Sequence, residues 1–156
     1  MRKFLAMFSL AFMMTTASAD DRKPYNDNAN AKEDVQAAFK TAKAENKAVL
    51  IVFGGNWCGD CKVLDIEMHQ GELAKLVNDK LVVVKVDVGR FDKNLDVANR
   101  YGNILKKGVP SVALVRADGS VAYQTDGGEL ADARKMGRDG ITQFFRAMLA
   151  KVKVNG

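Results

Sequence analysis

Two continuous aliphatic runs constrain the fold of this chain more than any other feature. Residues 48–53 read Ala-Val-Leu-Ile-Val-Phe, and residues 81–88 begin with Leu-Val-Val-Val. Runs of this length and branching, closed by glycine or polar residues, are typical of strands buried on both faces of a sheet. Helical patterns separate the two runs, so we expect parallel strands joined by a right-handed crossover.

The flanking segments add further helices and an antiparallel hairpin. Helices are predicted at residues 31–46, 58–69, 72–78 and 95–101, and from residue 139 onward. Residues 112–115 and 121–123, joined across Asp118-Gly119, predict the hairpin. Residues 125–138 are interpreted as a loop insertion. We therefore expect an α/β fold, in which a mixed central sheet of parallel and antiparallel strands has helices on both faces.

The first 19 residues have the three parts of a secretory signal peptide. A basic start at Arg2-Lys3 precedes an apolar run over residues 4–14, and Ala17-Ser18-Ala19 offers the small residues that a signal peptidase cuts. The run is too short to span a bilayer as a helix. We expect export to the periplasm, with residues 20–30 as a flexible lead-in and residues 31–156 as one domain.

The charge and composition of the expected mature chain exclude several classes of protein. The full sequence has 24 Lys and Arg against 19 Asp and Glu, and two of the basic residues leave with the signal peptide. Acidic and basic residues are interleaved, without the dense basic block of a nucleic-acid-binding surface. No later apolar stretch is long enough for a membrane span. Two cysteines are too few for a small protein built on disulfides.

Both cysteines fall in one C-x-x-C motif, Trp57-Cys58-Gly59-Asp60-Cys61, just after the first predicted strand. Two intervening residues let the thiols meet within one turn, so a disulfide can close and reopen locally. The partial positive charge of a helix N-terminus favours the thiolate of Cys58, which we expect to attack. Cys61, one turn further in, would resolve the mixed disulfide between Cys58 and a substrate.

Three other interpretations of this pair carry less weight. A zinc site needs four ligands, but His69 is the only histidine and there is no second cysteine pair. A purely structural disulfide is common in exported proteins, yet so small a loop stabilises the fold little. Two free buried thiols are unusual in an oxidising compartment. We expect no bound metal and no separate cofactor.

The segment from the first strand through Gly54-Gly55-Asn56 and the C-x-x-C motif resembles the active site of thioredoxin-like proteins. The resemblance extends over residues 35–149 and includes Gly108-Val109-Pro110-Ser111, which is similar to the cis-proline loop of that family. In the family this loop lies against the dithiol and offers backbone hydrogen bonds to substrate. The resemblance implies a cis Val109–Pro110 peptide and a substrate-binding surface made of Trp57, Val109 and Pro110. Without the cysteines, an ordinary trans proline would be expected.

Three positions need separate attention. Gly59-Asp60 stands where the family most often has Gly-Pro, and Val52 stands where many thioredoxins have a buried acid that relays protons. That relay is therefore absent or supplied elsewhere. Lys85 matches a lysine that the family keeps beneath the dithiol, although a strand lysine reaching solvent at a sheet edge is an equally good interpretation.

Asp60 suggests the direction of electron flow. A carboxylate near Cys58 disfavours its thiolate, and a less stable reduced form makes a dithiol a better electron donor. We therefore expect a monomeric, periplasmic reductase of protein disulfides that a membrane thiol–disulfide electron donor re-reduces. The alternatives are a disulfide oxidase or isomerase, and a thioredoxin-fold module that binds client proteins while its disulfide stays inert.

Overall fold

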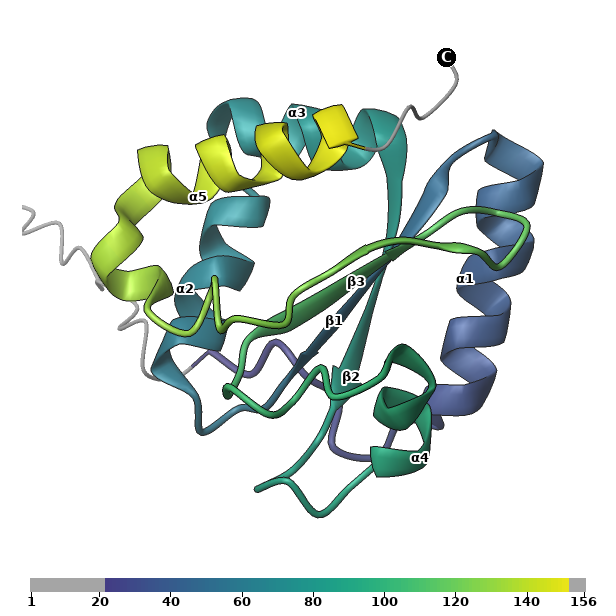
Figure 1. Ribbon diagram of the computed structural model, residues 1–156, viewed down its shortest axis with the longest axis horizontal. Coiled ribbons are helices and arrows are strands. Elements are labelled where there is room, and N and C mark those ends of the chain that lie inside the picture. Colours follow the sequence, from purple (N-terminus) through teal and green to yellow (C-terminus); the bar gives the residue numbers. More distant parts are fainter. Residues whose placement is uncertain (1–21, 152–156) are drawn as a thin grey trace, which may run out of the picture.

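A four-stranded mixed sheet forms the centre of the part of the chain that the structure describes (Figure 1). This computed structural model describes residues 22–151, and the predicted signal peptide lies outside them. The strands, in the spatial order β2-β1-β3-β4, are β1 (Ala48–Gly54), β2 (Leu81–Asp87), β3 (Ser111–Val115) and β4 (Val121–Gln124). β1 pairs parallel with β2 and antiparallel with β3, and β3 pairs antiparallel with β4. The predicted mixed sheet is confirmed.

Strand β1 is the buried centre of this sheet. All of its seven residues are buried, as its unbroken aliphatic sequence predicts. β2 differs from the prediction of a second fully buried strand, because it lies at the edge of the sheet and Val82, Val83 and Lys85 are partly exposed. The free edge of β2 is therefore the side of the sheet on which polar groups can collect.

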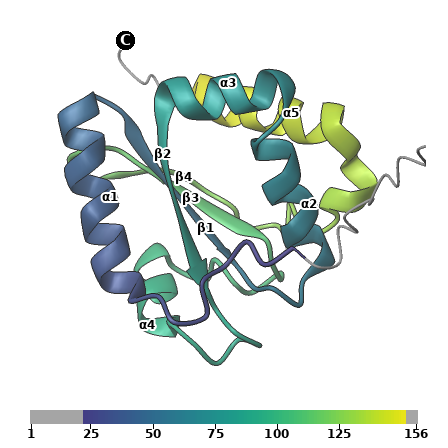
Figure 2. The same cartoon turned by 180° about the vertical axis from the view of Figure 1, so that it is seen from behind.

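Helices cover both faces of the sheet (Figures 1 and 2). On one face lie α1 (Ala31–Glu45), α4 (Leu95–Ala98) and the 3-10 turn η2 (Asn99–Tyr101), and on the other lie α2 (Gly59–Met68), α3 (Gly71–Lys80) and α5 (Ala133–Lys151). Alternate residues of β1 pack into the core layers on the two faces of the sheet: Ile51 and Phe53 face α1, whereas Val52 faces α5. Over residues 22–151, no helix has the length and apolarity that crossing a bilayer requires.

The hairpin between β3 and β4 closes through three residues rather than the two that Asp118-Gly119 suggests. The N–H of Arg116 donates to the carbonyl of Ser120 at 2.9 Å, and Gly119 donates back to Arg116 at 2.8 Å. Gly119 has φ 89°, a left-handed conformation that glycine adopts without steric cost. Asp118-Gly119 correctly predicts where the chain turns, but the two-residue loop that this pair suggests is wrong.

Helix α5 begins earlier than predicted, inside the segment interpreted as a loop insertion. Its first turn starts at Ala133, and Gly137 interrupts it with φ 64° and ψ −179° before the helix continues. Leu130 and Ala133 are fully buried in the α5 layer of the core. The insertion is therefore packed against the domain, and its last part is helical.

The lead-in predicted for residues 20–30 has no helix or strand over residues 22–30, yet one side chain anchors it. Tyr25 is 3% exposed. Its backbone N–H donates to Asn56 Oδ1 at 3.0 Å, and Asn56 Nδ2 donates to the Tyr25 carbonyl at 2.8 Å. Because Asn56 immediately precedes the C-x-x-C motif, the lead-in is fixed to the loop that carries the cysteines.

Candidate active site

Cys58 and Cys61 lie at the N-terminal end of α2 and are joined as a disulfide, with Cα atoms 5.2 Å apart. Cys58 is the N-cap residue of α2, and its Sγ accepts a hydrogen bond from the Cys61 N–H at 3.2 Å. Donors and the partial charge of a helix N-terminus stabilise a thiolate at this place. Cys58 is 5% exposed and Cys61 is 1% exposed. This order is the one expected for an attacking Cys58 and a resolving Cys61.

The loop before β3 lies against Cys58. The Val109–Pro110 peptide is cis, as predicted. The Val109 carbonyl oxygen lies 3.6 Å from Cys58 Sγ, so the reduced thiol can donate to it. Ser111 Oγ donates to the Gly108 carbonyl at 2.7 Å and holds the turn closed. The structure thus brings together residues that are 51 positions apart in the chain.

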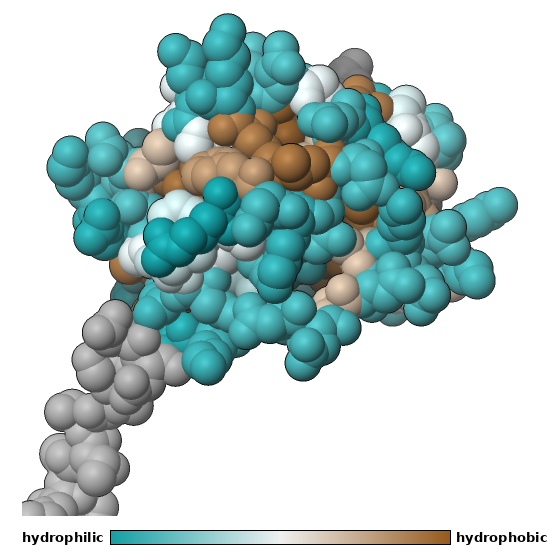
Figure 3. Space-filling view, turned by 90° about the horizontal axis from the view of Figure 1, so that it is seen from below, coloured by the Kyte–Doolittle hydropathy of each residue, from teal (hydrophilic) through white to brown (hydrophobic). Residues whose placement is uncertain are grey.

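An exposed aromatic surface, made of Trp57, Arg90 and Phe91, adjoins the cysteines. Trp57 and Phe91 are 43% and 42% exposed, and their rings meet edge to face with centroids 6.0 Å apart. The Arg90 guanidinium lies 5.3 Å from the centroid of the Trp57 ring, and Trp57 Nε1 donates to the Gly89 carbonyl. Figure 3 views the end of the sheet at which β1 and β2 finish, and shows apolar residues gathered within a largely hydrophilic face.

The backbone of Phe91 supports a functional interpretation of this surface. Its φ is 66°, in the left-handed region that bulky residues seldom occupy. Such conformations are costly and cluster at functional sites. The sequence drew attention to Trp57, but nothing in the spacing of residues pointed to Phe91 or Arg90.

Asp60 is held by Arg134, which comes from the first turn of α5. Asp60 Oδ1 accepts from the Arg134 N–H at 2.9 Å, and Oδ2 accepts from Nη2 at 3.0 Å. Burial tends to raise the pKa of Asp60, but the hydrogen bonds and charge of Arg134 outweigh it and hold the pKa below its ordinary value. The side chain is 12% exposed, so it does not point freely into solvent.

The ion pair with Arg134 alters the electrostatic effect of Asp60 on the cysteines. The guanidinium of Arg134 also lies beside Gly59, where a Cβ would stand 3.3 Å from Nη1. A positive charge therefore accompanies the carboxylate next to the motif and opposes its effect on the Cys58 thiolate. The expectation that Asp60 by itself makes the dithiol a better electron donor is correspondingly weakened.

Lys85 pairs with Asp65, a buried carboxylate on α2. Lys85 Nζ donates to Asp65 Oδ1, and the Asp65 side chain is 6% exposed. Arg22 Nη1 lies 3.4 Å from Oδ2 and His69 Nδ1 lies 3.6 Å from Oδ1. Val52 is buried in the α5 layer, whereas Cys58 and Cys61 belong to the α1 layer. A carboxylate in this region thus comes from α2 rather than from β1.

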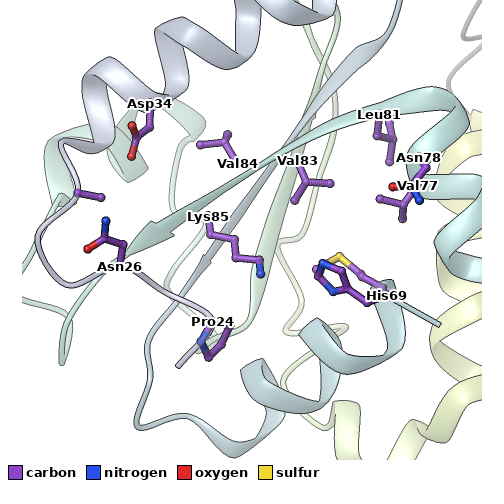
Figure 4. A pocket seen from close by; sticks show the side chains of 12 residues that line it. Pro24, Asn26, Asp34, His69, Val77, Asn78, Leu81, Val83, Val84 and Lys85 are labelled. Atoms are coloured by element: carbon purple, nitrogen blue, oxygen red, sulfur yellow. The ribbon is translucent and has the colours of Figure 1, made fainter. Parts of the chain in front are cut away.

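An open pocket of about 450 Å³ lies beside this ion pair, and Lys85 is one of the residues that line it. Lys85 of β2, His69 at the end of α2 and Pro24 of the lead-in lie along its lower part (Figure 4). Among the residues of the site, Asp65 had a sequence signal that was missed. Asp65 follows Cys58 by seven positions, and Cys61 follows Cys58 by three. At this helical spacing the three residues share one face of α2. Arg134 lies 74 positions from Asp60 and had no such signal.

Comparison with known proteins identifies the family. A family model described as thioredoxin-like matches residues 30–117, more than half of the chain. The chain belongs to the thioredoxin-like family. It is 40% identical to thioredoxin-1 of Drosophila yakuba over 58 residues, which are 37% of this chain and 50% of that protein. It is 34% identical to thioredoxin of Bacillus subtilis (strain 168) over 87 residues, which are 56% of this chain and 75% of that protein.

A solved structure resembles this thioredoxin-like chain over a longer span. The crystal structure of a disulphide isomerase from Xylella fastidiosa Temecula1 superposes with a TM-score of 0.80 at 42% sequence identity. The superposition covers 83% of this chain and 98% of that one. By contrast, the chain spans half the length of the Drosophila yakuba relative.

Proposed function

We propose that this protein is an exported thiol–disulfide oxidoreductase that reduces disulfides in other proteins. The observation that carries the proposal is the position of Cys58 Sγ, at the N-terminus of α2 and 3.6 Å from the Val109 carbonyl of the cis-proline loop. This arrangement combines a stabilised thiolate with a backbone edge against which an extended substrate can lie. Membership of the thioredoxin-like family supports the same chemistry.

The reaction needs no group beyond the two cysteines. The Cys58 thiolate attacks one sulfur of the substrate disulfide, and the electron pair of that bond leaves on the second sulfur, which takes a proton. Cys61 then attacks Cys58 Sγ, releases the substrate as a thiol and closes the Cys58–Cys61 disulfide. Two electrons and two protons must then be returned to the pair. In an oxidising compartment a membrane thiol–disulfide electron donor is the source we propose.

The direction of the reaction is tested by the reduction potential of the pair. Equilibrating the oxidised protein with glutathione or dithiothreitol buffers, with Trp57 fluorescence as reporter, gives this value. A potential near about −270 mV supports a reductase, whereas one near about −120 mV makes the protein an oxidant and overturns the proposal. A pair that stays oxidised in both buffers would favour the client-binding module.

Disulfide isomerisation is a second candidate, favoured by the relative from Xylella fastidiosa. The two activities separate in Cys61→Ser. A reductase needs Cys61 to release its substrate, whereas during isomerisation another thiol of the substrate can displace Cys58. If the protein is an isomerase, Cys61→Ser still refolds scrambled ribonuclease but no longer reduces insulin. Cys58→Ser is the control, because it removes both activities.

Export is proposed from the sequence of residues 1–19. Expression of the full chain in a bacterium, followed by mass spectrometry of the periplasmic fraction, tests it. We expect a mature protein that begins at Asp20. Recovery of the uncut chain from the cytoplasm alone would contradict export.

A further inference from the structure

The resolving cysteine, Cys61, must lose its thiol proton before it can attack Cys58. Cys61 is 1% exposed, so its thiol proton cannot pass directly to bulk water. Burial in apolar surroundings also disfavours the thiolate that must attack Cys58. The position used for a relay acid in many thioredoxins holds Val52, which is apolar and belongs to the other layer. A proton acceptor for Cys61 must therefore come from another part of the fold.

The hydroxyl of Tyr25 lies beside Cys61. A Cβ placed on Gly54 would stand closer than 3.0 Å to both Tyr25 Oη and Cys61 Sγ, so these two atoms are neighbours across the glycine. Gly54 leaves the space that both occupy. The two hydrogen bonds between Asn56 and the backbone of Tyr25 fix this side chain to the active-site loop. Tyr25 thus reaches the dithiol from a segment that the sequence presented only as a lead-in.

The lead-in that carries Tyr25 also contacts the Asp65–Lys85 pair, because Arg22 Nη1 donates to Asp65 Oδ2 at 3.4 Å. Burial raises the pKa of the Tyr25 hydroxyl first, and the negative charges of Asp65 and Asp87 raise it further. Tyr25 is therefore neutral and able to pass a proton without keeping a charge. Lys85 Nζ donates to Asp65 Oδ1, and the open pocket beside Lys85 and His69 admits water.

We propose that Tyr25 and Asp65 carry the proton of Cys61 away when this thiol resolves the mixed disulfide. The Tyr25 oxygen accepts the proton from Cys61 Sγ as its own proton passes to the Asp65 carboxylate. The Cys61 thiolate attacks Cys58 Sγ, the bond to the substrate sulfur breaks, and the electron pair leaves on that sulfur. Asp65 returns its proton to water in the pocket, and the substrate thiolate is protonated by solvent. This proposal rests on the proposed function.

The test separates the two chemical steps with a coloured disulfide, 5,5′-dithiobis(2-nitrobenzoate). Reduced protein releases one coloured thiolate when Cys58 attacks and a second when Cys61 resolves, and stopped flow records both phases. In Tyr25→Phe we expect an unchanged first phase and a second phase slowed roughly 100-fold, the low end of general acid–base catalysis. Raising the pH should restore the second phase, because hydroxide replaces the relay. Tyr101→Phe, at another buried tyrosine that packs on Phe53, should change neither phase.

Asp65→Asn gives an independent pH readout of the same relay. The wild-type second phase should level off between about pH 6 and 9, whereas that of Asp65→Asn should rise throughout this range. The measured profile also reflects the charged and titratable groups around this network: Arg22 and Tyr25 of the lead-in, Asp34 of α1, His69 just after α2, Lys85 and Asp87 of β2, and Lys93, which pairs with Asp87.

Several outcomes would overturn the relay. One is a second phase of Tyr25→Phe within twofold of wild type, and another is equal slowing of both phases, which indicates a structural role. If Tyr25→Phe does not fold, an Asp65→Asn profile that matches wild type overturns the relay by itself. Failure of the proposed function looks different, because wild-type protein would then show no first phase at all.

Discussion

Three charges or dipoles act on the thiol of Cys58: the N-terminus of α2, the Asp60 carboxylate and the Arg134 guanidinium. The helix terminus and Arg134 favour the thiolate, and Asp60 opposes it. Arg134 reaches the site only because the chain between β4 and α5 folds back onto α2. The redox properties of the pair are therefore adjusted by a residue far from it in sequence.

Arg134→Met should make the pair a stronger electron donor. Without the guanidinium, the Asp60 carboxylate acts unopposed, so the Cys58 thiolate is less favoured and the reduced form loses stability. We expect the reduction potential to become more negative by about 10–30 mV, where 30 mV corresponds to about 1.4 kcal/mol. Titration against glutathione measures it. Arg138→Met is the matched control, because Arg138 pairs with Glu67 further along α2. A shift to a less negative potential would contradict this account.

Phe91→Gly should weaken binding of protein substrates and leave the chemistry unchanged. Glycine relieves the left-handed backbone at this position but removes the ring that meets Trp57. Aromatic contacts contribute about 0.5–1.5 kcal/mol, so we expect the KM for insulin to rise about 2- to 10-fold. The rate with the coloured disulfide should stay the same. Val121→Ser, at an equally exposed apolar residue of β4, is the control and should leave both values unchanged.

At the scale of elements, the interruption of α5 at Gly137 separates two tasks. The turn before it carries Arg134 to Asp60, and the helix after it buries Ile141, Phe145 and Met148 in the core. Gly137 has φ 64° and ψ −179°, a combination that is essentially restricted to glycine. The change of direction at this residue allows both segments to pack at once.

Gly137→Ala should therefore destabilise the protein although nothing lies within 4 Å of the added Cβ. The cost is backbone strain of about 1–3 kcal/mol in the free energy of unfolding. Urea denaturation of the oxidised protein measures it. Gly127→Ala is the control, because Gly127 is in the same connecting segment and has no positive φ. Equal stability of the two variants would show that the helix can continue without a kink at residue 137.

The sequence predicted the elements well where one strong local pattern decides them, as in β1, α1 and the C-x-x-C turn. It predicted the cis Val109–Pro110 peptide through a family resemblance rather than through local physics. It failed where contacts between distant segments decide, since the burial of Tyr25 and the pairing of Asp60 with Arg134 have no local signature. Asp65 lies between these cases, because its place on the face of α2 with both cysteines could have been read from the spacing.

At the scale of the whole molecule, one end of the sheet carries the site and the two core layers support it separately. Cys58 and Cys61 belong to the layer of α1, whereas the body of α2 packs with α5 in the other layer. The disulfide turn therefore lies where the two layers meet. Tyr25 ties the lead-in to the first layer, and Arg134 ties the α5 segment to the turn itself.

Ionisation should limit the stability of the whole molecule at both ends of the pH range. Asp60 and Glu129 have lowered pKa values, caused by hydrogen bonds that outweigh burial, and Glu72, Asp96 and Asp118 have lowered values through exposed contacts. A carboxyl group whose pKa is lower in the folded protein stabilises the fold at pH values above its ordinary pKa, which is 3.8 for Asp and 4.5 for Glu. This stabilisation is lost as the pH falls through the lowered pKa. At the alkaline end, burial raises the pKa of Tyr123 to about 12 and also raises that of Tyr25, so stability is lost above their ordinary value of 10.0.

Urea midpoints across the pH range should therefore form a plateau that falls below about pH 4 and above about pH 10. Salt separates the contributions on the acid side. Screening weakens the exposed pairs of Glu72 and Asp96 but acts less on the Asp60–Arg134 pair, in which the Asp60 side chain is only 12% exposed. High salt should thus flatten only part of the acid loss, and Asp60→Asn should remove part of what remains, with Glu129 supplying the rest. If salt abolishes the acid loss entirely, the exposed pairs account for it and the ion pair beside the cysteines contributes only to their redox chemistry.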